Sequence, residues 1–180
     1  MQRVALGSLV VLIVLSVAAP SPGQDSKSSA IAKDLVGALD AAKLDSIAAK
    51  DPSASDAFVA ALYFPGLQML VISARYSAPQ LLNDRLTKKE YRDVYMDLSG
   101  AGTPASKVFI EDLSADGLKV KHEENKGPDA FETGGARTVF DGDWKRQKLS
   151  EADYLKAFSA ADDRYAQLLT ALVAQAKKGR

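Results

Sequence analysis

The sequence contains no cysteine, and it has a single histidine, His122. The lack of cysteine excludes disulfides, thiolate metal sites, a thiol nucleophile and a lipid-modified N-terminal cysteine. A single histidine excludes any metal site or proton relay that needs two imidazoles. Aromatic residues make up only 7% of the chain, which is too few to predict a surface that stacks on nucleic-acid bases. The fold must therefore be held together by packing.

The chain also lacks net charge, because 23 basic side chains balance 23 acidic ones. Such a balance predicts no broad electrostatic attraction to nucleic acid or to an anionic membrane surface. The expected partner is therefore an unknown protein or a small ligand. We expect neither nucleic-acid binding nor, after loss of the leader described next, stable membrane association.

The longest apolar run lies at the N-terminus, where Arg3 is followed by apolar residues 4–19 and then by Pro-Ser-Pro-Gly. This order of charged, apolar and small residues is typical of a secretory signal. We expect residues 1–23 to be a signal peptide and residues 24–180 to be one domain that is extracytoplasmic, either periplasmic or secreted. An uncleaved anchor is the alternative, because the run approaches the roughly 17–25 residues that span a bilayer.

Amphipathic helices are predicted near both ends of the remaining chain. Leu35 and Leu39 belong to an apolar series at helical spacing, which predicts a helix over residues 30–49. Ser150 is a helix-capping residue, and the residues after it form one long apolar stripe. The sequence therefore predicts a long C-terminal helix.

Between these helices the pattern changes several times. Residues 55–63 predict a short helix, and the continuous apolar run 67–74 predicts a strand that is buried on both faces. Capping signals predict helical turns within 79–98, with a strand at the end of that segment as the rival interpretation. Residues 124–136 are polar and rich in glycine, which predicts an exposed loop, and residues 137–140 predict another strand.

This order of elements favours an α+β fold. We expect an antiparallel or mixed sheet of about four to five strands, packed by an N-terminal helix and a long C-terminal helix. A small open β-barrel flanked by helices is the alternative.

Residues 107–123, KVFIEDLSADGLKVKHE, are the most informative segment. The apolar residues 108–110 lead to Asp116-Gly117, and alternating residues 118–122 follow. This pattern predicts two strands joined by a tight hairpin turn.

The same segment also has the spacing of a calcium-binding loop. Asp112, Ser114, Asp116 and Glu123 stand at positions 1, 3, 5 and 12, and Gly117 stands at position 6. The strand-like flanks argue against a helix–loop–helix site, and an extended segment after the turn would carry Glu123 away from the other three residues. We therefore prefer the hairpin and keep these four residues as calcium candidates.

No catalytic constellation is recognisable in the sequence. The serines lie in neither a G-x-S-x-G elbow nor an S-x-x-K arrangement, and no dinucleotide fingerprint is present. The leading hypothesis is a non-enzymatic extracytoplasmic module that binds a protein or small ligand, with no predicted catalytic or cofactor-binding residue. The alternatives are a calcium-binding module that uses the 112–123 loop, and an enzyme whose carboxylates are assembled by the fold.

Overall fold

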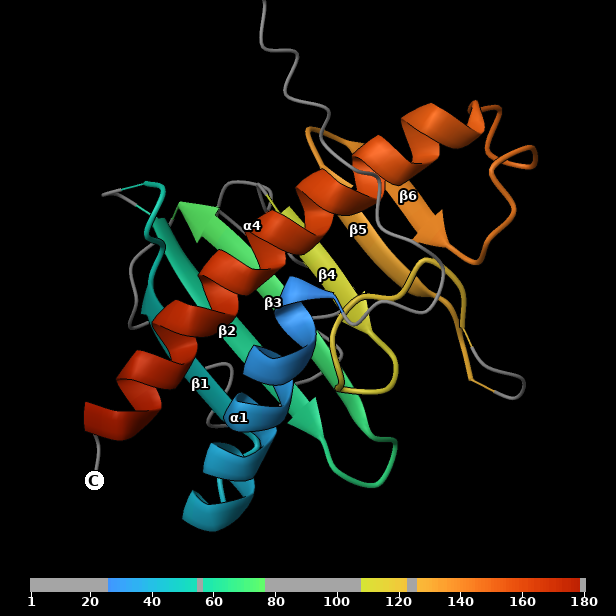
Figure 1. Cartoon of the computed structure of the whole chain (residues 1–180). Helices are drawn as coiled ribbons and strands as arrows, with labels where there is room; N and C mark the ends of the chain where they lie inside the picture. The colour runs from blue at the N-terminus through green and yellow to red at the C-terminus, as the bar shows by residue number, and fades with distance from the viewer. Residues whose placement is uncertain (1–25, 55–56, 77–107, 123–125, 179–180) are drawn as a thin grey trace, which may run out of the picture.

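The computed structural model of the chain describes residues 26–54, 57–76, 108–122 and 126–178. Six strands form one antiparallel sheet, and each strand pairs with its neighbours in the sequence. Helices α1 and α4 lie on the same face of this sheet, and α4 runs diagonally across it from β6 towards β1 (Figure 1). The elements are α1 (Lys27–Ala42), β1 (Ser46–Lys50), β2 (Ala57–Phe64), β3 (Met69–Tyr76), β4 (Val108–Asp112), β5 (Asp129–Thr133), β6 (Ala136–Phe140) and α4 (Glu151–Lys178).

The α+β prediction is confirmed, including the helices at both ends of the chain. The sheet has six strands rather than four or five, and it is open rather than closed into a barrel. Within the described residues, no helix is both long enough and apolar enough to cross a membrane.

The main core lies between the sheet and the two helices. Side chains alternate between the two faces of a strand, so each row of paired residues faces one side. The middle row on the helical face runs across five strands and is largely apolar. It consists of Ile47, Ala61, Ile72, Ile110 and Phe131. Leu35 and Leu39 from α1 and Tyr165, Leu168 and Leu172 from α4 are completely buried in this core.

A second apolar cluster lies on the opposite face of the sheet. Ala60 and Leu62 of β2, Val71 of β3 and Phe109 of β4 are buried there. The strands β2 and β3 are therefore apolar on both faces. This explains why neither strand shows the alternation of a strand with one solvated face.

Two helix predictions in the first third of the chain need correction, the first in part and the second completely. The predicted helix 30–49 ends at Ala42, where Lys43 adopts a left-handed conformation with φ 54°, and residues 46–50 form β1. The predicted helix 55–63 is instead β2. Alanine favours helices in isolation. In β2 the alanines are buried in the sheet, and tertiary packing overrides that preference.

The strand predictions at 67–74 and 137–140 are confirmed with small shifts in their bounds, as β3 and β6. The long C-terminal helix is also confirmed, and the Ser150 hydroxyl accepts a hydrogen bond from the N–H of Asp153 at 3.1 Å. The helical turns predicted within 79–98 lie outside the described residues.

The predicted hairpin around Asp116-Gly117 is confirmed only in its first strand, which is β4, and the predicted loop at 124–136 is wrong where residues 129–133 form β5. Residues 118–122 form no strand, and the place beside β4 is taken by β5. Strands β5 and β6 are joined by Gly134-Gly135, whose φ angles of 58° and 77° suit a two-residue hairpin turn. The hairpin signal was therefore present in the sequence, but one strand pair later than predicted.

Candidate functional site at the 112–119 loop

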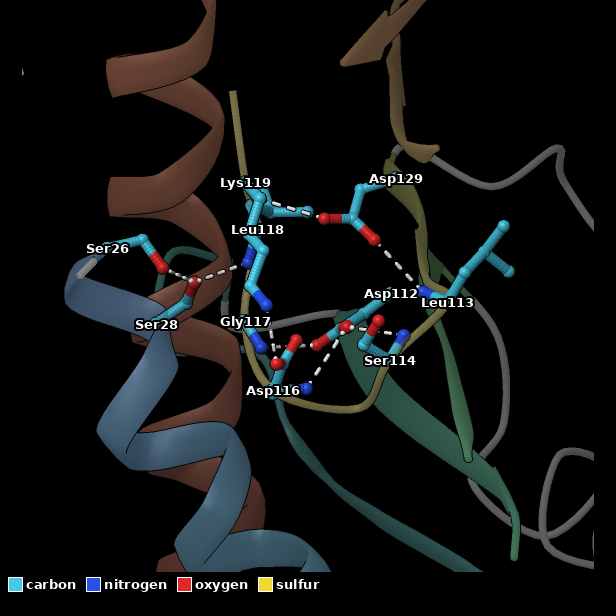
Figure 2. Close-up of polar contacts among 10 residues, drawn as sticks. All are labelled: Ser26, Ser28, Asp112, Leu113, Ser114, Asp116, Gly117, Leu118, Lys119 and Asp129. Atoms are coloured by element: carbon cyan, nitrogen blue, oxygen red, sulfur yellow. Dashed lines mark hydrogen bonds and ion pairs between the residues drawn. The ribbon is translucent and has the colours of Figure 1, made fainter. Parts of the chain in front are cut away.

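The loop after β4 is organised by the carboxylate of Asp112, which is completely buried. The Asp112 Oδ1 atom accepts hydrogen bonds from the N–H groups of Ser114 at 3.3 Å and Asp116 at 3.2 Å. Its Oδ2 atom accepts from the N–H of Gly117 at 2.8 Å and from the hydroxyl of Tyr165 in α4 at 3.0 Å. Asp112 therefore fixes the turn, as Figure 2 shows, and its hydrogen bond with Tyr165 attaches the turn to the C-terminal helix.

Asp129, the first residue of β5, binds the same loop from the other side. Its two carboxylate oxygens accept hydrogen bonds from the N–H of Leu113 at 3.0 Å and from the N–H of Lys119 at 2.9 Å. Figure 2 shows the loop curving around the Asp112 side chain, with the Asp129 carboxylate between Leu113 and Lys119. The two carboxyl groups thus hold the loop at its beginning, middle and end.

The far end of the loop packs against the start of α1. The N–H of Leu118 donates to the Ser28 hydroxyl at 3.0 Å, and Leu118 itself is completely buried. Gly117 has a φ of 92°, and a Cβ atom placed on it would lie 2.5 Å from the Ser29 Cα. Glycine is therefore required here both for the backbone conformation and for the close approach to α1.

Four consecutive residues of α4, 162–165, bind three different parts of the fold. Asp162 accepts hydrogen bonds from the first N–H groups of α1, those of Lys27 at 2.7 Å and Ser28 at 3.0 Å. It thus caps a helix that receives no side-chain hydrogen bond from its own N-cap residue, Ser26. Asp163 pairs with the Lys27 ammonium group. Arg164 binds Asp51 after β1, and Tyr165 binds Asp112 after β4.

The buried carboxyl groups bind protons more tightly than exposed ones. Burial is the main cause that raises the pKa of Asp112 above its ordinary value, and the amide donors oppose this effect only partly. Burial, followed by the charge of Asp112, raises the pKa of Asp129 to about 8. Burial and the Asp112 charge also raise the pKa of Tyr165 well above its ordinary value. Near neutral pH the pair therefore retains a proton that two exposed carboxyl groups would lose.

This arrangement stores a proton and fixes a loop. All four carboxylate oxygens of Asp112 and Asp129 already accept hydrogen bonds from the protein. Burial keeps these oxygens from solvent, because Asp112 is completely buried and Asp129 is almost completely buried. The chemistry that the cluster supports in the described structure is the internal binding of amide and hydroxyl groups.

The calcium candidates have different positions. Asp112 points into the core, and Ser114 contributes its backbone N–H to Asp112. One carboxylate oxygen of Asp116 pairs with the Lys119 ammonium group at 2.7 Å, and Glu123 lies outside the described residues. No group of three or more histidine, cysteine or acidic side chains with metal-binding geometry is found in the described part of the chain.

Sequence reasoning missed Asp129 and Tyr165. The polar residues around Asp129 predict an exposed loop, and the spacing of Tyr165 predicts only a place in the apolar stripe of the C-terminal helix. The Gly134-Gly135 turn is the signal that could have placed Asp129 at the start of a strand. Nothing in the local sequence of Tyr165 indicates that its hydroxyl meets a carboxylate 53 residues away.

Comparisons with known proteins identify no relative of this chain. No protein-family model matches the chain, and neither does any curated protein or solved structure.

Proposed function

We propose that this protein is an extracytoplasmic, non-enzymatic module that binds a protein or small ligand, and that a protein is the better match. The signal-like N-terminus supports the extracytoplasmic location. The engagement of the Asp112 and Asp129 oxygens by the loop supports a structural rather than a catalytic role for these groups. The observation that carries the proposal is the outer edge of β1, with which no strand of the described residues pairs.

The two edges of the sheet differ. At β6, the side-chain amide of Gln147 accepts from the Val139 N–H at 2.9 Å and donates to the Val139 carbonyl at 2.5 Å. Gln147 therefore occupies the position that a further strand would take. At β1, the outward N–H and C=O groups of Ser46, Ala48 and Lys50 have no partner within the described residues. An edge of this kind binds extended polypeptide by adding a strand to the sheet.

The inward and outward positions of β1 follow from its pairing with β2. The Asp45 carbonyl accepts from the N–H of Tyr63 at 2.8 Å, and the N–H of Asp51 donates to Ala57 at 2.9 Å. Antiparallel strands alternate between inward and outward bonding residues, so Ala48 bonds outward. Proline at position 48 therefore removes an outward N–H without breaking a hydrogen bond to β2.

The proposal is tested by comparing the wild-type protein with Ala48→Pro and with the matched control Ala48→Ser, which keeps the N–H. Each protein is immobilised and exposed to the extracytoplasmic fraction of its own cells, and circular dichroism confirms that all three are folded. We expect a partner that the wild type and Ala48→Ser retain and that Ala48→Pro loses. If all three proteins retain the same partners, or none, the edge is not the binding surface and the proposal is wrong.

A further inference from the structure

We infer that the outer edge of β1 accepts an extended, acidic segment of a partner protein as a seventh strand of the sheet. This inference rests on the proposed function, because it uses the same edge and specifies the chemistry of the partner. It follows from three features of the described residues, namely the backbone groups of β1, the small size of its side chains and the charges around it.

The first two features define an extended polypeptide as the ligand. Ser46, Ala48 and Lys50 direct their N–H and C=O groups outward at every second residue, which is the spacing that another strand matches. Ser46 and Ala48 are small and lie on the face of the sheet opposite the helices, so they leave room beside the edge for larger side chains of an incoming strand on that face. Backbone pairing would supply affinity, and these neighbouring side chains would supply part of the specificity.

The third feature is the positive charge along this side of the molecule. Lys50 is the charged residue of β1 itself, and Lys43 lies at the end of α1; both are exposed. Helix α4 contacts β1 and ends on the same side of the sheet, where Lys177 and Lys178 are exposed (Figure 1). These four lysines favour an acidic ligand.

The acidic residues on the same side weaken this charge only in part. Asp51 follows β1 directly, but its carboxylate is almost completely buried and is paired with Arg164. Asp40 at the end of α1 is exposed, and Asp45 lies in the turn before β1. The four exposed lysines therefore outnumber the nearby carboxylates that are available to oppose them.

A second copy of this chain matches the edge less well. Antiparallel self-pairing centred on Ala48 would satisfy the outward backbone groups, with Ser46 opposite the partner's Lys50. It would also bring the lysines of both copies to a single edge, where they repel each other. A pair of five-residue strands buries too little surface to offset such repulsion, since stable interfaces bury about 1,200–2,000 Å².

The experiment uses two fluorescent peptides as probes, Glu-Glu-Thr-Val-Thr-Val-Thr-Glu-Glu and the same peptide with lysine in place of glutamate. Binding to the full chain is measured by fluorescence anisotropy at low and high salt. We expect the glutamate peptide to bind about tenfold or more tightly than the lysine peptide at low salt, and the difference to shrink at high salt. Ala48→Pro should bind neither peptide, whereas Ala48→Ser should behave as the wild type.

A charge-reversal pair tests whether the preference arises at β1. Lys50→Glu should reduce the advantage of the glutamate peptide by about threefold or more, because it reverses the charge beside the bound strand. Lys145→Glu changes the net charge equally, but it alters an exposed residue beyond β6, so it should leave the advantage unchanged. Equal effects of the two substitutions would show that only net charge matters and would overturn the inference.

A cysteine pair tests the second copy as the occupant. In self-pairing centred on Ala48, the two residues at position 48 lie about 5.5 Å apart between Cα atoms, within disulfide range. Two residues at position 46 lie about 13 Å apart, because four residues at about 3.3 Å each separate the positions. Disulfide dimers of Ala48→Cys but not of Ser46→Cys would therefore identify a second copy and overturn the inference. The natural absence of cysteine makes each introduced thiol unique.

The outcomes also separate this inference from the proposed function. Loss of a captured partner in Ala48→Pro, together with equal binding of the two peptides, would leave the proposed function standing and refute the acidic ligand. Capture that is insensitive to Ala48→Pro, with no peptide binding, would refute both.

Discussion

Asp51 and Asp112 both hold α4 against the rest of the fold, Asp51 through Arg164 and Asp112 through Tyr165. Both carboxylates are almost completely buried, but their partners differ. Asp51 has a guanidinium group at 2.5 Å, whereas Asp112 accepts hydrogen bonds from three backbone amides and a phenol. The neutral donors offset the burial of Asp112 only partly, so the pKa of Asp112 lies above its ordinary value.

The comparison teaches that similar burial can have different consequences. The Asp51–Arg164 pair is close to solvent on one side, because the Arg164 side chain is 20% exposed. The Asp112 cluster includes Asp129 and a completely buried Tyr165. We call the Asp51–Arg164 and Asp112–Tyr165 contacts the two anchors of α4. We expect the Asp112 anchor to contribute more than the Asp51 anchor to the stability of the fold and to its dependence on pH.

The largest expected effect is that of removing one carboxylate from each anchor. Asp112→Ala leaves three amides and the Tyr165 hydroxyl without an acceptor, and should lower the free energy of unfolding by about 3–5 kcal/mol. Asp51→Ala should cost about 1–2 kcal/mol, because Arg164 can be hydrated where it is exposed. Urea denaturation of both variants measures the difference, and equal losses would contradict the ranking.

The next effect is a dependence of stability on pH that arises at one anchor only. The folded-state pKa of Asp129 is about 8, above the ordinary value of 3.8, so the native state binds this proton more tightly than the unfolded chain does. The stabilisation is therefore fully present below about pH 4 and is lost as the pH rises through about 8. We expect the wild type to lose about 4 kcal/mol of unfolding free energy between pH 5 and pH 9 from this site.

Two isosteric variants isolate the group responsible. Asp129→Asn should remove most of the decline between pH 5 and pH 9, because the titrating carboxyl group is gone. Asp51→Asn changes the other anchor and should keep the decline. The measurement is a series of urea titrations at several pH values, and a decline that persists in Asp129→Asn would show that another group causes it.

The smallest expected effect concerns a serine at each anchor. Ser28 is completely buried and accepts a hydrogen bond from Leu118, so Ser28→Ala should cost about 1–2 kcal/mol. Ser53 is exposed and accepts from Arg164 at 2.7 Å, so Ser53→Ala should change stability by less than about 0.5 kcal/mol. Thermal unfolding of the two variants is sufficient to rank them, and a larger loss in Ser53→Ala would reverse the comparison.

The sequence predicted the features of the fold that depend on local pattern. The apolar stripe and the capping serine located α4, and the continuous apolar run located β3. The pattern failed at β2. Burial on both faces removes the alternation of apolar and polar residues, and the alanines have the composition typical of a helix. It also failed at β1, which continues directly from a helix and has only one large apolar side chain, Ile47.

The candidate site was predicted only in part. Asp112, Asp116 and Gly117 were recognised as an unusual group because their spacing is local. Their actual partners, Asp129 and Tyr165, come from distant parts of the sequence, and the interactions form only when the sheet and α4 are assembled. A single sequence contains no local signal for such pairs, so the spacing was interpreted as a metal-binding loop or a hairpin.

The cluster of contacts at residues 162–165 has a consequence for the order in which the protein folds. Its hydrogen bonds join residues that are 135, 113 and 53 positions apart in the sequence. Contacts of such high sequence separation form slowly, because long segments of chain must be brought together first. During synthesis, α1 and the loop after β4 lack these contacts until α4 has left the ribosome, so we expect this part of the nascent chain to reach its native state only after α4 has emerged.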